Sequence, residues 1–374
     1  MLLRRLRTKV PFLGKGASSR PYPAAARARA ARADAREVPM ADGGEGTLDA
    51  LVAAAGGRTI HAPARDPLGR AIRAPYGVLP DGTAVVELAA ASGFERLSDA
   101  ERDPEATTTA GTGDLMRAAL DGGCRRIVLG VGGSATTDGG LGIIIALGAR
   151  ALDAAGRELP GIGGVLAAVR QVDLSALDPR LRAVPVEVAC DVMSPLAGPG
   201  GAARVFAPQK GADPDAVARL DAGLMSLVAV LARQGHADVT RLPRAGAAGG
   251  AAGGLAAMIG ARLVDGGVMV ARAVDLAGAL ADADLCITGE GRLDDQTRAG
   301  KAPAVVAEAC AQAGVPCVGL FGAVDVSAAE AQAMGFAQAR RIAPAAYPRA
   351  EALAATADHL ASTTTDVVAL RASS

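Results

Sequence analysis

Carboxylates and basic residues that stand beside glycines are the parts of this sequence best suited to chemistry. The first such group is Asp42, Gly43, Gly44 and Glu45. Adjacent glycines let the backbone approach a phosphate and expose its N–H groups. The two carboxylates could hold Mg²⁺ or hydrogen-bond a hydroxylated substrate. A tight turn with a solvated acidic face is the alternative that composition alone leaves open.

A second glycine-rich loop, residues 130–140, follows a short apolar run. Its first residues fit part of a dinucleotide fingerprint, so an NAD-type oxidoreductase is one alternative. However, the paired glycines at its end would break a helix that began inside the loop. We therefore predict a phosphate-cradling loop followed by a helix over 141–150 that offers its N-terminus to an anion, with a purely structural turn as the alternative. Its candidate binding residues are Gly132, Gly133, Ser134 and Asp138.

Two single residues stand in promising positions further along. Asp191 follows the strand-like run 184–189. A carboxylate there can take the proton from a substrate hydroxyl or hold Mg²⁺, although it could also be a capping or turn residue. Lys210 lies between Gln209 and Gly211 and is a candidate partner for a phosphate or carboxylate, unless it is simply solvated.

The segment 288–303 is dense in charge and follows another apolar run. Gly300-Lys301 has the look of a Walker A ending, but Ala302 stands where Ser or Thr is required, so we reject a P-loop. Opposite charges at one strand end suit a site that handles a magnesium nucleotide and an anionic substrate together. A solvated loop is the alternative. The candidates here are Glu290, Arg292, Asp294 and Lys301, with Glu290 and Asp191 as the metal ligands.

The elements that would position these residues follow a repeated order of strand, polar glycine loop and helix. That order is typical of α/β proteins with parallel sheets. Ligands of such folds bind at the carboxyl ends of the strands, where the candidate residues fall. The sequence therefore predicts an α/β fold whose strand ends form the site.

Composition and charge indicate the kind of core and exclude some classes of partner. With 374 residues, 50% of them hydrophobic, the chain can bury a large core of one or two domains, and because aromatics are only 2% that core must be aliphatic. The formal net charge of zero argues against nucleic acid or an anionic membrane as a partner. No apolar run of about 18 residues predicts a membrane span.

The five cysteines form no C-x-x-C pair and lie in apolar stretches. This pattern predicts buried, reduced thiols in a cytoplasmic protein. Only three histidines are present, and they are scattered, so the sequence offers no His/Cys metal cage.

Taken together, the motifs resemble the bacterial class I glycerate kinases over about 330 residues. The matching segments are V-P-M-A-D-G-G-E-G-T (38–47), G-V-G-G-S-A-T-T-D-G-G-L-G (130–142), A-C-D-V (189–192), F-A-P-Q-K-G-A (206–212), G-A-A-G-G (246–250) and I-T-G-E-G-R-L-D-D-Q-T-R-A-G-K-A-P (287–303).

The resemblance implies that ATP and Mg²⁺ are used to phosphorylate D-glycerate, with 2-phosphoglycerate favoured over 3-phosphoglycerate as the product. It implies a flavodoxin-like domain built from 38–66 and 283–374, an inserted α/β domain over 67–282, and an active site between them, in a monomer or homodimer. Asp191 is the favoured base or metal ligand, with Asp294 second. Lys210, Arg292 and Lys301 would neutralise carboxylate and phosphate charge.

Residues 1–37 depart from the family. They hold roughly ten Lys and Arg against two acids, and we expect a disordered basic segment or a transit peptide. Members of the family begin with a hydrophobic strand and a P-D-S-F-K-G-S loop. Residues 11–18 match this loop only weakly. A frameshift or wrong start upstream of about residue 36 would explain this. The alternative function is a catalytically impaired, nucleotide-binding relic.

Overall fold

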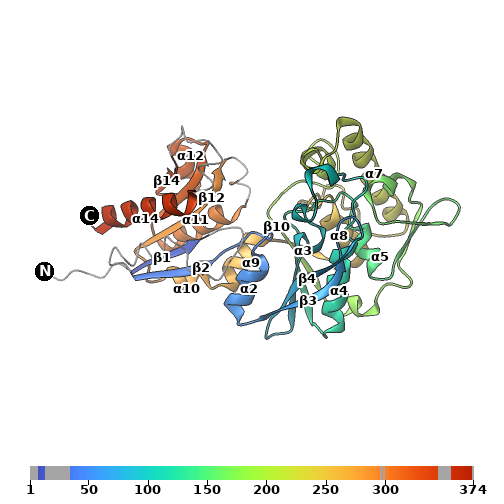
Figure 1. Ribbon diagram of the computed structural model, residues 1–374, viewed down its shortest axis with the longest axis horizontal. Helices are drawn as coiled ribbons and strands as arrows, with labels where there is room; N and C mark the ends of the chain where they lie inside the picture. The colour runs from blue at the N-terminus through green and yellow to red at the C-terminus, as the bar shows by residue number, and fades with distance from the viewer. Residues whose placement is uncertain (1–6, 13–33, 295–296, 298–299, 344–354, 373–374) are drawn as a thin grey trace. The chain divides into compact units, whose positions relative to one another are not determined.

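The computed structural model describes residues 7–12, 34–294, 297, 300–343 and 355–372, and the chain forms two compact units. The first unit consists of residues 1–42 and 267–374, and the second is the continuous segment 43–266. Figure 1 shows the α/β architecture of both units. This agrees with the fold class expected from the alternation of strands and helices.

The first unit is built on a five-stranded, fully parallel sheet in the order β14-β13-β12-β1-β2. Numbered within this sheet alone, the order is 2-1-3-4-5, the flavodoxin-like arrangement. The strand bounds are β1 Arg7–Phe12, β2 Asp34–Pro39, β12 Leu285–Leu293, β13 Cys317–Val324 and β14 Gln338–Arg341.

The expectation of disorder throughout residues 1–37 is wrong at β1 and β2. β1 pairs with β12 on one side and with β2 on the other, so Arg7–Phe12 occupies a central place in the sheet. Its sequence, RTKVPF, holds two basic residues and a proline and carries little strand signal. Pairing with two neighbours decides the conformation here, as sheet context often does. Residues 13–18 of the degraded motif lie outside the described residues.

Helices pack around this sheet. α11 contacts β12 and β13, α12 contacts β14, and α14 contacts β13. The helix bounds are α9 Gly266–Ala273, α10 Leu276–Leu280, α11 Ala302–Ala313, α12 Ala328–Ala333 and α14 Thr356–Ala372.

The second unit contains a six-stranded sheet in the order β11-β10-β6-β5-β4-β3. β11, β10, β6 and β5 are parallel, whereas β4 and β3 add an antiparallel hairpin at one edge. The bounds are β3 Arg58–Arg65, β4 Ala71–Val78, β5 Thr83–Glu87, β6 Arg126–Gly130, β10 Val186–Cys190 and β11 Arg262–Asp265. A small antiparallel sheet holds β7 Arg150–Leu152, β8 Glu158–Leu159 and β9 Gln171–Asp173.

The helices of the second unit bury an aliphatic core against the large sheet, as the scarcity of aromatics predicts. Their bounds are α2 Thr47–Ala55, α3 Ala89–Ser92, α4 Ala110–Asp121, α5 Leu141–Ala146, α6 Ala202–Phe206, α7 Pro214–Arg233 and α8 Ala251–Ile259. Short 3-10 helices span Phe94–Arg96, Asp99–Glu101, Gly163–Ala168, Pro179–Arg182 and Pro208–Lys210.

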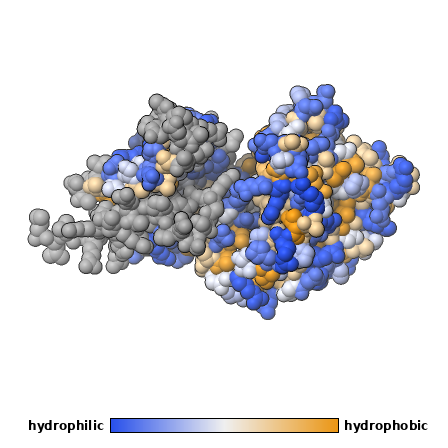
Figure 2. Space-filling model, in the orientation of Figure 1, coloured by the Kyte–Doolittle hydropathy of each residue, from blue (hydrophilic) through white to orange (hydrophobic). Residues whose placement is uncertain are grey.

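The surface of the second unit mixes hydrophilic residues with scattered hydrophobic ones, as the visible face in Figure 2 shows. The exposed large hydrophobic side chains of the described residues are Leu68, Met193, Val205, Met225 and Leu242. Among the helices described, none has the length and apolar character needed to cross a membrane.

The unit boundaries differ from those expected. Segment 43–66 was expected in the flavodoxin-like domain, but α2 and β3 lie in the second unit, because β3 pairs with β4 and α2 packs on β4 and β5. Segment 267–282 was expected in the inserted domain, but α10 packs on α11 in the first unit.

Candidate active site

The carboxyl edge of the parallel strands in the second unit gathers most of the candidate residues. β5, β6 and β10 run side by side in register and end at Glu87, Gly130 and Cys190. The chain then continues into the loop 131–140 after β6 and into Asp191 after β10. Parallel pairing therefore brings segments sixty residues apart in sequence to one edge of the sheet.

The first glycine loop packs directly onto this edge. Gly43 has φ +96°, and a Cβ there would lie 2.5 Å from the carbonyl oxygen of Ala189. Its own carbonyl accepts a hydrogen bond of 3.1 Å from the amide of Gly132. A Cβ on Gly132 would lie 2.4 Å from the Cα of Gly44. These positions require glycine because two backbones meet there.

Glu45 lies beside the second glycine loop. A Cβ built on Gly133, which has φ +70°, would stand 3.0 Å from the carboxylate oxygen Oε1 of Glu45. Gly43, Gly44 and Glu45 thus meet Gly132 and Gly133 within one unit. The sequence predicted that both loops belong to a site, and the structure brings them together.

Asp138 organises the second loop from inside. Its side chain is fully buried and accepts hydrogen bonds from the amide and hydroxyl of Thr109, at 2.8 and 2.7 Å, and from the amides of Gly140 and Gly142, at 3.0 and 3.2 Å. Burial raises the pKa of Asp138, while these hydrogen bonds lower it.

The expectation that the helix after this loop offers its N-terminus to an anion is wrong. The amides of the first turn of α5 are already used: Gly142 donates to Asp138, and Ile143 donates to the hydroxyl of Thr109 at 3.1 Å. α5 also ends at Ala146, not at residue 150, because Gly148 has a non-helical φ of +109° and Arg150 begins β7.

Lys210 is among the largest fully buried side chains of the described residues. Its ammonium donates hydrogen bonds to the hydroxyl of Ser134, at 2.8 Å, and to the carbonyl of Thr136, at 2.5 Å. Burial lowers the pKa of Lys210 to about 7, and the negative charge of Asp138 opposes that shift. The alternative of a solvated lysine is therefore wrong.

Lys210, Ser134 and Asp191 all line one pocket of about 180 Å³. Within the described part of the chain, no protein acceptor takes the amide N–H groups of Gly133 and Ser134, which belong to the same lining. Free backbone donors beside a buried ammonium form a cradle for an anion. The complete lining is Phe94, Val131, Gly132, Gly133, Ser134, Cys190, Asp191, Val192, Phe206, Gln209, Lys210, Ala247 and Ala248.

The charge-rich segment of the first unit forms a second group. The hydroxyl of Thr297 donates to Glu290 at 2.6 Å, and its amide donates to Asp294 at 3.3 Å. Lys301 Nζ lies 3.7 Å from Glu290 and 3.9 Å from Asp294. Burial is the main cause that raises the pKa of Glu290, Thr297 and Lys301 lower it, and the carboxylates of Asp42 and Asp294 raise it again.

Two of the predicted residues have unexpected surroundings. β12 continues to Leu293, so Glu290 and Arg292 lie within a strand and not in a loop, because they stay paired with β13. Arg292 is mostly exposed and forms an ion pair of 3.1 Å with Asp325, whereas Glu290 and Asp294 pair with Lys301.

Comparison with known proteins identifies the family. A family model described as the glycerate kinase family matches residues 22–372. A glycerate kinase from Bacillus subtilis is 44% identical over 338 residues, which cover 90% of this chain and 88% of the relative. A glycerate 2-kinase from Escherichia coli is 45% identical over 288 residues, 77% of this chain and 76% of the relative.

The chain belongs to the glycerate kinase family. A crystal structure described as a glycerate kinase 2 from Salmonella typhimurium LT2 has a TM-score of 0.78 and 40% identity, covering 97% of this chain and 98% of that one. The family makes this protein an ATP-dependent kinase that phosphorylates an alcohol group. The oxidoreductase alternative is therefore wrong, and α5 does begin after the loop, not inside it.

Sequence reasoning missed one prominent residue of this glycerate kinase fold. Arg244 donates to the carbonyl of Cys190 at 3.1 Å, next to Asp191, and to the carboxylate of Asp265 at 2.8 Å. It thereby ties the ends of β10 and β11 together. Its φ of +73° is uncommon for a residue with a side chain, which often marks a functional position. The only signal in the sequence is its place just before the motif at 246–250.

Proposed function

We propose that this protein transfers the γ-phosphoryl group of ATP to the 2-hydroxyl of D-glycerate, with Mg²⁺, to give 2-phosphoglycerate. The observation that carries this proposal is the buried Lys210 in the same pocket as Asp191. One group can bind an anion and the other can accept a proton. The names of the relatives from Bacillus subtilis and Escherichia coli support the choice of glycerate and of the 2-position.

The pocket suits a small organic acid. Its volume of about 180 Å³ lies below the ~300 Å³ at which sites for drug-sized ligands begin. Lys210 has two neutral hydrogen-bond acceptors, and burial favours its uncharged form. A substrate carboxylate or phosphate would supply the missing negative charge and keep the ammonium protonated.

Asp191 is the proposed general base. It follows directly on β10, is partly exposed and lines the pocket that holds Lys210. A carboxylate in that position can accept the proton of the attacking hydroxyl as the phosphorus–oxygen bond forms. Arg244 holds the preceding carbonyl and so fixes the backbone that carries this carboxylate.

The residues of the first unit fit a magnesium ion. Burial raises the pKa of Glu290, and the negative charges of Asp42 and Asp294 raise it further. Lys301 forms ion pairs with Glu290 and Asp294. Carboxylate oxygens are the ligands that Mg²⁺ prefers. We assign Glu290 and Asp294 as its protein ligands and Lys301 as a contact to phosphate oxygens. When bound, Mg²⁺ neutralises the charge of the phosphates of ATP.

Release of ADP from ATP, Mg²⁺ and D-glycerate, followed by phosphorus NMR of the product, tests the proposal. Lactate keeps the 2-hydroxyl and lacks the 3-hydroxyl, whereas 3-hydroxypropionate has the reverse pattern. We expect turnover of D-glycerate to 2-phosphoglycerate and phosphorylation of lactate in preference to 3-hydroxypropionate. Formation of 3-phosphoglycerate would overturn the assigned position, and tight ATP binding without ADP release would favour the impaired relic.

A reducing compartment such as the cytoplasm is part of the proposal. All five cysteines are free thiols, and four of them are buried. Unpaired buried thiols are usual where glutathione and thioredoxin keep cysteines reduced.

A further inference from the structure

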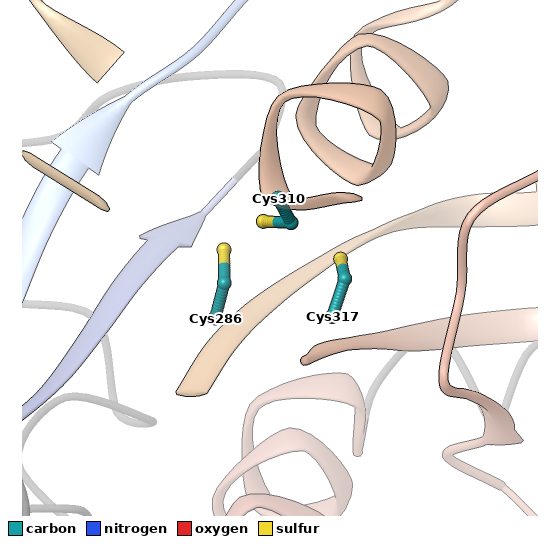
Figure 3. Close-up of side chains that lie close together, drawn as sticks. All are labelled: Cys286, Cys310 and Cys317. Carbon is teal, nitrogen blue, oxygen red and sulfur yellow. The ribbon is translucent and has the colours of Figure 1, made fainter. Parts of the chain in front are cut away.

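Three cysteines of the first unit, none of which has a role above, form a compact cluster. The sulfur atoms of Cys286 on β12, Cys310 on α11 and Cys317 on β13 all lie within 4.8 Å of one another. In Figure 3 the sulfurs of Cys286 and Cys317 rise from their strands toward the helix that carries Cys310. Sequence patterns could not reveal this cluster because it combines two strands and a helix.

The fold holds the three thiols in place. Cys286 and Cys317 are direct partners in the parallel register of β12 and β13, so their side chains point to the same face of the sheet. α11 packs on both strands and buries the face that carries Val306, Ala307 and Cys310. All three cysteines are at most 1% exposed.

The surroundings of this trithiol cluster favour ligands that leave no net charge. Hydrogen bonds with Cys286 and Cys317 lower the pKa of Cys310, whereas the hydrogen bond with Cys310 and burial raise the pKa of Cys317. Among the described residues, no basic side chain shifts either pKa value, so none stands ready to compensate a thiolate. Burial raises the pKa of Cys286, and thiol hydrogen bonds from its neighbours raise it further. An isolated charge in such a place is strongly unfavourable.

These conditions select among the ions that bind sulfur. Zn²⁺ prefers four ligands, and three thiolates around a divalent ion would leave one negative charge in the apolar core. Three thiolates around a monovalent ion such as Cu(I) would leave two negative charges. A trivalent centre with three thiolates is neutral and needs no fourth ligand.

We propose that Cys286, Cys310 and Cys317 form a capture site for trivalent arsenic, which enters as uncharged arsenous acid. Three S–H bonds and three As–O bonds break, three As–S bonds form, and each thiol proton leaves with a hydroxyl group as water. Arsenic stays trivalent and no sulfur is oxidised, so the step needs no redox partner. Entry requires a local opening of α11 from the strands.

Native mass spectrometry of the full-length protein, reduced with a phosphine and mixed with arsenous acid, tests the site. We expect one adduct per chain, with a mass gain of one arsenic atom less three hydrogens. Each of the variants Cys286→Ala, Cys310→Ala and Cys317→Ala should lose this adduct. Cys124→Ala is the matched control and should keep it, because Cys124 is a half-buried thiol of the other unit.

X-ray absorption at the arsenic edge of the wild-type protein provides a check that no variant can confound by misfolding. Three sulfur neighbours and no oxygen support the proposal. Two sulfurs with a retained hydroxyl, an adduct that Cys124→Ala abolishes, binding of Zn²⁺ but not of arsenic, or no adduct at all would each overturn it. None of these measurements uses kinase activity, so their outcome is separate from that of the proposed function.

Discussion

The ammonium of Lys210 donates a hydrogen bond of 2.8 Å to the hydroxyl of Ser134, and both buried residues line one pocket. The two residues stand 76 positions apart in the chain. A lysine so deeply buried, with only neutral acceptors in hydrogen-bond contact, is costly for the protein to keep charged. It is therefore the position at which removal of one group should be most informative.

We expect Lys210→Met to lower kcat/KM for glycerate by about 10²–10³-fold, because a preorganised donor to an anion is lost in a site shielded from water. Steady-state kinetics measures the effect. Arg219→Met removes an exposed positive charge of the same unit, paired with Glu105, and should leave kcat/KM within a factor of two of wild type, about the size of ordinary surface changes. Equal losses in both variants would contradict the assignment.

Lys210 should also contribute to the pH dependence of the free energy of unfolding. Its folded pKa of about 7 lies below the ordinary 10.5, so the unfolded chain binds more protons between these two pH values. The free energy of unfolding should therefore rise with pH across that window. Urea titrations at several pH values should find this rise reduced in Lys210→Met; identical slopes in variant and wild type would mean that the lysine is not buried as described.

Asp191→Asn should lower kcat by about 10²–10⁴-fold, because the amide cannot accept the hydroxyl proton. The unfolding midpoint should change little, since the side chain is partly exposed at the pocket. Asp215→Asn, at an exposed position in the first turn of α7, is the control for the loss of a carboxylate. An Asp191→Asn enzyme with wild-type kcat would remove this residue from the mechanism.

Glu290→Gln should raise the Mg²⁺ concentration needed for half-maximal activity by about tenfold or more, the loss typical of a weakened metal site. Initial rates against Mg²⁺ at saturating ATP measure it. The matched change Glu308→Gln, exposed on α11, should leave the Mg²⁺ dependence unchanged. If both variants follow the wild-type curve, Glu290 is not a ligand.

Asp138→Asn should lower the stability of the fold, because Asp138 anchors its own loop. The two carboxylate oxygens of Asp138 together accept four hydrogen bonds, and in asparagine an NH₂ group would face donors in place of one of them. We therefore expect a loss of about 1–3 kcal/mol in the free energy of unfolding. Chemical denaturation followed by circular dichroism gives the value. Asp238→Asn at an exposed turn serves for comparison, and an unchanged midpoint in Asp138→Asn would contradict the anchoring role.

Removal of residues 1–12 should abolish activity and the cooperative unfolding of the first unit, because β12 and β2 lose the strand between them. Removal of residues 1–6 alone keeps β1 and is the control. A fully active protein without residues 1–12 would mean that β1 has no part in the working fold.

Much of the fold follows from local sequence. Glycines and apolar runs mark β6, β10 and the helices between strands, so the carboxyl edge of the sheet and its loops could be predicted. β1 could not be predicted, because Lys9 and Pro11 interrupt the apolar pattern of a buried strand. Its conformation follows from pairing with β12 and β2. Local patterns also say little about where a side chain points. Asp138 and Arg292 both have the residue type expected of a binding group, but Asp138 accepts hydrogen bonds from its own loop and Arg292 pairs with Asp325.

The site was predictable as a set of residues but not as a set of contacts. Arg244, Thr297 and the trithiol cluster depend on long-range packing that no spacing encodes. Lys210 illustrates the limit well, since its hydrogen-bond partners, Ser134 and Thr136, lie in the loop 131–140 and not among its neighbours in the sequence.

The discontinuous first unit has a consequence for biosynthesis. The second unit is continuous, so all of its strands are translated before β12. β1 and β2 are made first, yet their sheet can close only after the entire second unit has emerged, since β1 needs β12 as a neighbour. The nascent chain thus carries an unfinished sheet edge through most of its synthesis, the kind of exposed strand on which chaperones act.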